Sequence, residues 1–122
     1  MYYVTVEKTF DAAHYLQGYK GKCEKLHGHR YRIVVNLEVG ELDGSGMAYD
    51  FTLLKKQLAG ILESYDHQCL NDVPPFDKGN PTAENIACSI YSRMLPLLKK
   101  KVRLDIVAVW ESPESCATYK PG

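Results

Sequence analysis

Two histidines and a cysteine that lie close together in the chain are the residues most suited to chemistry. His27 and His29 stand two apart in Cys-Glu-Lys-Leu-His-Gly-His, so on an extended strand both imidazoles project from one face. Gly28 between them has no side chain to crowd a third ligand or a substrate. Cys23 lies upstream in a Lys- and Gly-rich segment that is typical of a loop. The pattern indicates a catalytic metal site; the alternative is a pair of solvent-facing histidines that bind nothing.

His14 is the third candidate ligand. It closes the stretch 2–14, whose alternating pattern predicts a strand, and His27 opens the next alternating stretch, 27–40. If these strands pair as a hairpin, His14 lies beside His27 and His29, and three imidazoles surround one ion. Three neutral histidines with an open fourth position are the usual plan of catalytic zinc, which acidifies or polarises a bound oxygen. The alternative for His14 alone is a packed strand residue.

The remaining histidine, His67, directly follows Asp66 after the first predicted helix. A carboxylate can orient an imidazole and stabilise its cationic form. Because adjacent residues rarely bond side chain to side chain, we expect the two to contribute separately to one network; a capping or surface pair is the alternative. A thiol such as Cys23 beside a cationic or imidazole partner ionises near neutral pH and gives a base or a nucleophile.

Composition limits the class of protein. The 122 residues suit one domain, 1–122, with a single core. Fifteen Lys plus Arg against 15 Asp plus Glu leave no net charge, which argues against a nucleic-acid binder. We find neither a signal-peptide pattern nor an apolar run of membrane-spanning length, and four cysteines without a CxxC pair favour reduced thiols. We therefore expect a cytoplasmic protein without membrane or nucleic-acid partners.

The predicted elements follow the order ββααββ. After the two strands, Asp50 is a good N-cap for a first helix, 66–81 is a loop rich in Pro, Asn and Gly, and a second helix starts near Pro81 or Thr82. Strands at 102–111 and about 115–120 close the chain. This order predicts an α+β fold in which both helices cover one face of a four-stranded antiparallel sheet.

The predicted faces of the strands bear on assembly. The uncovered sheet face should remain partly apolar from its Val and Tyr content, which predicts self-association. In the third strand, strict alternation places two sets of residues on opposite faces. These sets are Leu104, Ile106, Ala108 and Trp110, opposite Arg103, Asp105, Val107, Val109 and Glu111.

Five motifs in this order resemble the 6-pyruvoyltetrahydropterin synthase family. They are FDAAH, CEKLHGH, DHQCLN, PTAEN and the late WES-P stretch, and together they span almost the whole chain. Within the family, the nearest resemblance is to the bacterial 6-carboxytetrahydropterin synthases of queuosine biosynthesis.

The resemblance implies a fold, an assembly and a set of roles. The fold would be the two-layer tunnelling fold (T-fold), assembled through its sheets into a trimeric barrel and usually a hexamer. Each implied residue matches a position in the motifs above. The matches are His14, His27 and His29 as Zn²⁺ ligands, Cys23 as the proton-abstracting thiol, Asp66 and His67 as the rest of the acid–base relay, Glu111 as the carboxylate that anchors the pterin ring, and Thr82 and Glu84 as pocket residues.

Physical arguments bear on the roles of Glu111, Thr82 and Glu84. A carboxylate such as Glu111 can form bidentate hydrogen bonds with the adjacent N–H and amino donors of a pterin ring. Thr82 and Glu84 have a structural alternative, in which Thr82 caps the second helix and Glu84 favours its positive end. Lys22, Lys25 and Arg30 are candidate phosphate contacts by charge alone.

The implied reaction converts 7,8-dihydroneopterin triphosphate to 6-carboxy-5,6,7,8-tetrahydropterin, acetaldehyde and triphosphate. The pyruvoyl-forming synthase and a side-chain-cleaving folate branch remain open, since some folate-type relatives carry a glutamate in or near the cysteine position and Glu24 adjoins Cys23. A non-catalytic, zinc-stabilised binding module is the alternative of another class, and it predicts that chelation unfolds the protein.

Overall fold

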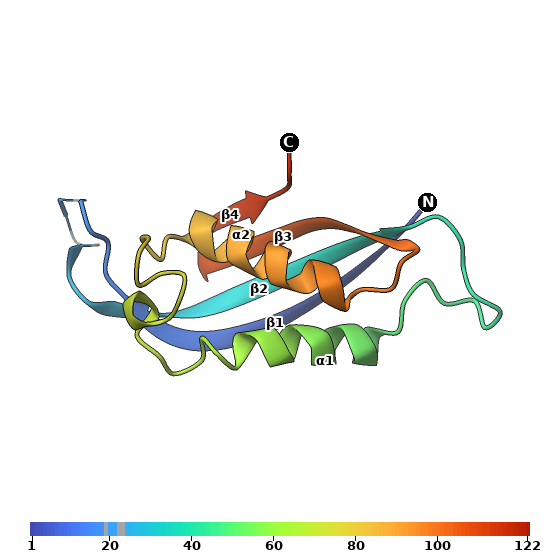
Figure 1. Ribbon diagram of the computed structural model, residues 1–122, viewed down its shortest axis with the longest axis horizontal. Helices are drawn as coiled ribbons and strands as arrows, with labels where there is room; N and C mark the ends of the chain where they lie inside the picture. Colours follow the sequence, from blue (N-terminus) through green and yellow to red (C-terminus); the bar gives the residue numbers. More distant parts are fainter. Residues whose placement is uncertain (19, 22–23) are drawn as a thin grey trace.

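The computed structural model describes residues 1–18, 20–21 and 24–122, so Cys23 lies outside the described residues. The elements follow the predicted ββααββ order (Figure 1). They are the strands β1 (Tyr2–His14), β2 (His27–Val39), β3 (Val102–Ser112) and β4 (Ser115–Tyr119), the helices α1 (Phe51–Leu62) and α2 (Ala83–Met94), and the short 3-10 turns η2 (Leu70–Asp72) and η3 (Leu95–Leu97).

The four strands form one antiparallel sheet in the order β1-β2-β3-β4. The first two strands pair without interruption from Tyr2 opposite Val39 to His14 opposite His27. Since both patterns alternate over 13 residues, the register brings the buried positions of the two strands onto the same face. The predicted hairpin is therefore confirmed, and it fixes where the histidines meet.

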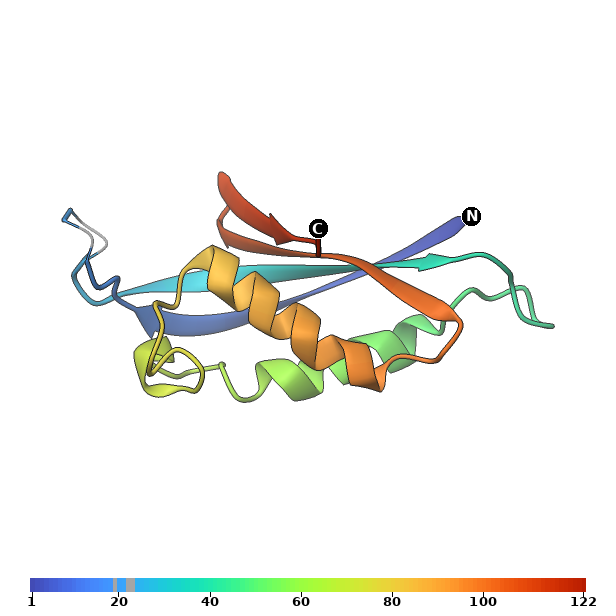
Figure 2. The same cartoon turned by 45° about the horizontal axis from the view of Figure 1, so that its top comes forward.

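Both helices lie on one face of the sheet, as predicted (Figure 2). Helix α1 packs on β1, and α2 packs on β3 and β4. Between helices and sheet lies a core of fully buried side chains, which includes Tyr31, Ile33, Leu54 and Ile90. Each helix starts at a residue whose side chain accepts a backbone N–H bond: Asp50 from Thr52, and Thr82 from Asn85. No helix among the described residues is long and apolar enough to cross a membrane.

Strand β3 departs from the predicted alternation. Leu104 pairs with Leu37, but Ile106 pairs with Asn36, so Asp105 is an extra residue on β3. This β-bulge reverses, for every later residue of β3, the face of the sheet that strict alternation would assign to its side chain. Val107 and Val109, which were predicted opposite Leu104, are fully buried on its face instead. The prediction for β3 was wrong beyond Leu104, and the corrected parity brings Glu111 onto the helix-covered face.

The uncovered face of the sheet carries Val34 and Trp110, and polar pairs cross its strands. The Arg32 guanidinium lies 2.9 Å from Glu7 and 4.8 Å from the centre of the Trp110 ring. Similar cross-strand pairs join Thr5 to Asn36, Asp11 to Arg30 and Asp105 to Lys120. The face is thus partly apolar, as expected, but it is also extensively paired within the chain. Self-association through it stays a prediction.

Candidate active site

Three histidines converge at the end of the β1–β2 hairpin. His14 and His27 are cross-strand partners, and His29 pairs with Ala12 one step along the same face. The Nε2 atoms of His14 and His27 are 3.1 Å apart, and one ring nitrogen from each of the three histidines lies within 4.8 Å of the others. We call His14, His27 and His29 the histidine centre.

Backbone carbonyls hold two of these rings. The Nδ1 of His14 lies 2.8 Å from the carbonyl oxygen of Pro81, and the Nδ1 of His27 lies 2.6 Å from that of Lys25. A carbonyl only accepts, so each Nδ1 carries the proton and each Nε2 keeps its lone pair facing the centre. The Tyr31 hydroxyl lies 3.1 Å from the same Nδ1 of His14, and the two rings pack edge to face. The rings are therefore set in the tautomer that a metal ion needs.

Burial gives the centre its electrostatic character. His14 is only 1% exposed, and burial lowers the pKa of both His14 and His29, so their imidazoles stay neutral near pH 7. The buried Nε2 of His29 has no hydrogen-bond partner among the described residues, although Glu111 Oε1 lies 3.4 Å away. Neutral imidazoles with an orphaned, inward-facing nitrogen fit a metal ion bound by nitrogen.

Glu111 reaches this centre from the end of β3. The strand is irregular there, because Trp110 pairs with Cys116 and Ser112 with Ser115, which leaves Glu111 without a partner on β4. Its half-buried carboxylate lies beside His29 and lines a cavity of about 510 Å³. A bulged strand end can aim a side chain into a site in this way.

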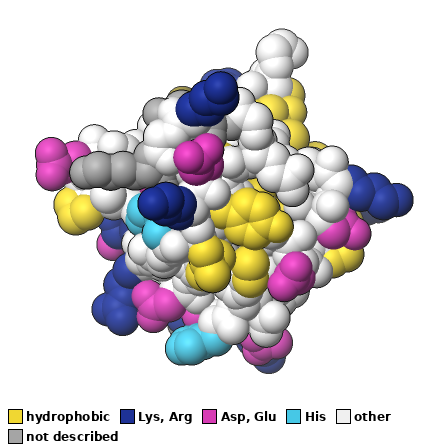
Figure 3. All heavy atoms as spheres, turned by 90° about the vertical axis from the view of Figure 1, so that its left-hand side faces the viewer, with side chains coloured by type: hydrophobic (Ala, Val, Ile, Leu, Met, Phe, Trp, Pro, Cys, Tyr) yellow, Lys and Arg dark blue, Asp and Glu magenta, His cyan; other side chains and the backbone are white. Residues whose placement is uncertain are grey.

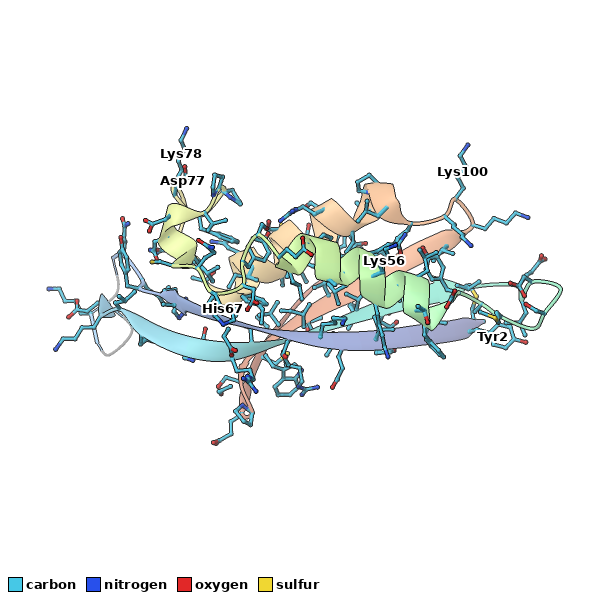
Figure 4. All side chains as sticks on the ribbon, turned by 90° about the horizontal axis from the view of Figure 1, so that it is seen from below. Tyr2, Lys56, His67, Asp77, Lys78 and Lys100 are labelled. Atoms are coloured by element: carbon cyan, nitrogen blue, oxygen red, sulfur yellow. The ribbon has the colours of Figure 1, made fainter. Side chains whose placement is uncertain are left out.

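A second group, Asp11, Asp66 and His67, lies at the outer edge of β1; we call it the carboxylate–histidine cluster. Figure 4 labels His67 beside β1. Asp66 Oδ2 lies 2.9 Å from His67 Nδ1, so the expectation that these neighbours do not bond side chain to side chain was wrong. Its other oxygen accepts the N–H of Asp11, and the two bonds lower the pKa of Asp66.

The backbone of Asp11 explains this geometry. Its carbonyl accepts the N–H of His67 at 2.6 Å, while its own N–H donates to the Asp66 carboxylate at 3.0 Å. His67 has φ 58, a conformation that few non-glycine residues adopt. Strand β1 thus holds Asp66 and His67 together in an otherwise unfavourable turn.

The two groups border one depression. A cavity of about 580 Å³ is lined by Asp11 and His67 of the cluster and by His29 of the centre, and also by Arg30 and Cys69. Figure 3 looks onto this end of the molecule, where histidine side chains reach the surface in separate places among charged groups. A larger cavity of about 800 Å³ lies between α1 and α2, but none of the described candidate site residues lines it.

Comparison with known proteins decides the family. The sequence matches the family described as 6-pyruvoyl tetrahydropterin synthase over residues 3–122. The chain belongs to this family. It is 36% identical to 6-carboxy-5,6,7,8-tetrahydropterin synthase of Bacillus subtilis, over 90% of this chain and 79% of that protein. It is 38% identical to dihydroneopterin monophosphate aldolase of Pyrococcus furiosus, over 87% of this chain and 86% of that protein.

The fold agrees with this assignment. The structure of Caenorhabditis elegans 6-pyruvoyl tetrahydropterin synthase superposes with a TM-score of 0.85 at 34% identity, covering 100% of this chain and 98% of the other. The predicted tunnelling fold is confirmed, and the chain belongs to a family of tetrahydropterin synthase enzymes that act on small pterin molecules.

The other predicted family positions fall in different places. Thr82 caps α2 through Asn85 and Glu84 is exposed in its first turn, as the structural alternative proposed, and neither lines the two cavities at His29. Arg30 is held by Asp11 at 2.9 and 3.3 Å. Cys23 and Lys22 lie outside the described residues. The sequence reasoning missed Asp11, although its place in the motif FDAAH was a signal.

Proposed function

We propose that this chain is a zinc-dependent 6-carboxytetrahydropterin synthase of queuosine biosynthesis. The observation that carries the proposal is the convergence of the His14, His27 and His29 nitrogens beside Glu111 in a member of this family. The branch is supported by relatives named 6-carboxy-5,6,7,8-tetrahydropterin synthase, such as the one from Bacillus subtilis. The substrate would be 7,8-dihydroneopterin triphosphate, and the enzyme would act as a carbon–oxygen and carbon–carbon lyase.

The histidine centre would hold the metal. His14, His27 and His29 supply three neutral nitrogen ligands, a set that suits Zn²⁺ with an open position for substrate. When bound, the ion supplies Lewis-acid chemistry that makes nearby hydroxyl and C–H groups of the substrate more acidic. The Pro81 and Lys25 carbonyls keep His14 and His27 oriented for this task.

Glu111 and the carboxylate–histidine cluster would act on different ends of the substrate. The Glu111 carboxylate would accept two parallel hydrogen bonds from the ring N–H and amino group of the pterin, which fixes the ring at the end of β3. His67, oriented by Asp66 at 2.9 Å, would give and take a proton at its exposed Nε2. Cys23 would move the side-chain proton, a role that rests on the family resemblance.

Assembly belongs to the same proposal. The family resemblance implies assembly through the sheets, and we propose a homo-oligomer, a trimer or a hexamer. Sedimentation of the purified protein at micromolar concentration would show a single species larger than the 13.8 kDa chain. A monomer at that concentration would contradict the proposal.

The decisive experiment is incubation of the zinc-loaded protein with 7,8-dihydroneopterin triphosphate, followed by mass analysis of the pterin. We expect a 6-carboxytetrahydropterin together with acetaldehyde and triphosphate. Cys23→Ala should abolish turnover while zinc content stays unchanged. Loss of zinc with the thiol would make Cys23 a fourth ligand and the site a closed, structural one.

One relative supports a second candidate, a side-chain-cleaving aldolase of the folate branch. The Pyrococcus furiosus relative is named dihydroneopterin monophosphate aldolase and is 38% identical to this chain. Glu24, which adjoins Cys23, is a candidate second base. The same mass analysis separates the branches, because a hydroxymethyl-pterin marks the aldolase and a pyruvoyl-pterin marks the 6-pyruvoyl synthase. A chain that unfolds on chelation and makes no product would instead be a zinc-stabilised binding module.

A further inference from the structure

The outer edge of β1 is paired with the segment that follows α1. Asp11 exchanges backbone and carboxylate bonds with Asp66 and His67, and the N–H of Ala13 donates to the Gln68 carbonyl at 3.0 Å, next to a parallel bridge with Cys69. These contacts involve every second residue of β1, as in a strand pair. Strand β1 therefore connects the histidine centre, through His14, with the carboxylate–histidine cluster at its outer edge.

Two asparagines continue this pairing beyond the end of the strand. The Tyr15 N–H donates to Asn71 Oδ1 at 3.0 Å, and Asn71 Nδ2 donates back to the Tyr15 carbonyl at 3.0 Å. Gln17 makes the same exchange with Asn80, at 2.8 and 2.7 Å. A side-chain amide carries one acceptor and donors in a plane, so it reproduces the peptide group of a neighbouring strand.

The asparagines are themselves held. Asn71 belongs to η2 and is buried, with 7% of its surface exposed. The carbonyl of Asn80 accepts a bond from the Asn85 side chain at 2.8 Å, and the next carbonyl, that of Pro81, holds His14. Both asparagines therefore connect the chain after His14 to segments that are fixed elsewhere in the fold.

We propose that Asn71 and Asn80 are positioning residues for catalysis. Their amides hold the backbone that directly follows His14, at Tyr15 and Gln17, and so they set the rate of turnover without touching the substrate. The expected effect on turnover rests on the proposed function, whereas the expected effect on the structure of the chain does not. It also accounts for Asn71 in DHQCLN and for Asn80, which directly precedes PTAEN; neither is among the residues proposed above to bind the metal or the pterin.

The test uses isosteric variants, Asn71→Asp and Asn80→Asp. A carboxylate keeps the acceptor for the backbone N–H but removes the donor and repels the backbone carbonyl. We expect kcat to fall about tenfold to a hundredfold, the usual cost of losing a contact that aligns catalytic groups. KM should change by no more than about twofold, and the zinc content should stay unchanged. Tryptic cleavage after Lys20 and Lys25 should become faster.

Gln57→Glu is the matched control. Gln57 also accepts one bond, from the Tyr49 hydroxyl, and donates another, to the Leu97 carbonyl, far from the site. This variant should keep the kcat and the cleavage pattern of the unmodified protein. Asn80 is nearer the surface than Asn71, so Asn80→Asp tests the proposal if Asn71→Asp does not fold.

Two results would overturn the proposal. One is a folded Asn80→Asp protein with unchanged kcat and unchanged cleavage after Lys20 and Lys25. The other is a kcat that falls only in step with thermal stability, with cleavage equally faster after Lys55 and Lys100. If the unmodified protein makes no pterin product, the proposed function fails, and the cleavage at Lys20 and Lys25 alone decides whether the asparagines hold the chain.

Discussion

The histidine centre and the carboxylate–histidine cluster both place imidazoles at the same end of the sheet, yet they differ in burial and in the partners of their ring nitrogens. His14 in the centre is buried, and the ring nitrogens of this centre face one another. His67 in the cluster is 78% exposed and has a carboxylate 2.9 Å from its Nδ1. Burial lowers the pKa of His14 and His29 and favours their neutral, metal-binding form, whereas His67 is exposed and has a carboxylate that can orient its ring for proton transfer.

The comparison shows that residue type alone does not assign a role. All four histidines of the chain lie at this end, and their surroundings divide them into three candidate metal ligands and one acid–base candidate. This division predicts that a substitution in the carboxylate–histidine cluster should lower turnover but leave zinc binding intact, whereas a substitution in the histidine centre should abolish zinc binding.

The largest effect is expected from His29→Ala. Removal of one of three ligands, the one with an orphaned buried nitrogen, should abolish stoichiometric zinc binding at micromolar metal and with it all measurable turnover. Metal analysis of the purified variant and titration with a chromophoric zinc chelator would measure this.

His67→Ala is the matched control for that experiment. It should keep one zinc per chain while kcat falls by about a hundredfold to ten-thousandfold, the usual contribution of a general acid or base. If His67→Ala lost zinc, or His29→Ala kept it, the division between the two groups would be wrong.

A smaller effect is expected from Glu111→Gln. The change keeps the shape of the side chain but removes a charge-assisted acceptor that is worth about 1.5–3 kcal/mol, so KM should rise about tenfold to a hundredfold. Zinc content should not change, because the carboxylate lies beside His29 and is outside the ligand set. Steady-state kinetics would measure KM, and an unchanged value would remove Glu111 from the ring-binding role.

The smallest effect concerns acid stability. The Asp11 N–H and the His67 ring lower the pKa of Asp66, so its carboxylate stabilises the fold at pH values above its unfolded pKa of about 3.9. That contribution is lost as pH falls through the lower, folded pKa. Urea unfolding of the metal-free protein should show a stability gap between wild type and Asp66→Asn that is present near pH 6 and narrows toward pH 3. A gap that widened on acidification would contradict this assignment.

The histidine centre could be predicted from the sequence because it depends on two local rules. A period of two places His27 and His29 on one face, and a hairpin with matched alternation brings His14 beside them. Both rules act within neighbouring strands, and no distant part of the chain had to be known.

The parts that could not be predicted depend on distant contacts. The extra residue Asp105 is visible only in its pairing with β2, and the bond between Asp66 and His67 depends on a backbone group of Asp11, which lies 55 residues from Asp66. In the same way, the partners of Asn71 and Asn80 lie 56 and 63 residues away. No local pattern of hydrophobicity records such contacts.

The bulge at Asp105 has a consequence for how this site tolerates change. Glu111 faces His29 because of the number of residues between Leu104 and the end of β3, whatever side chain stands at position 105. Replacement of Asp105 would cost little more than its ion pair with Lys120, whereas its deletion would turn Glu111 to the other side of the sheet. The placement of Glu111, the proposed pterin anchor, thus depends partly on the number of residues in β3.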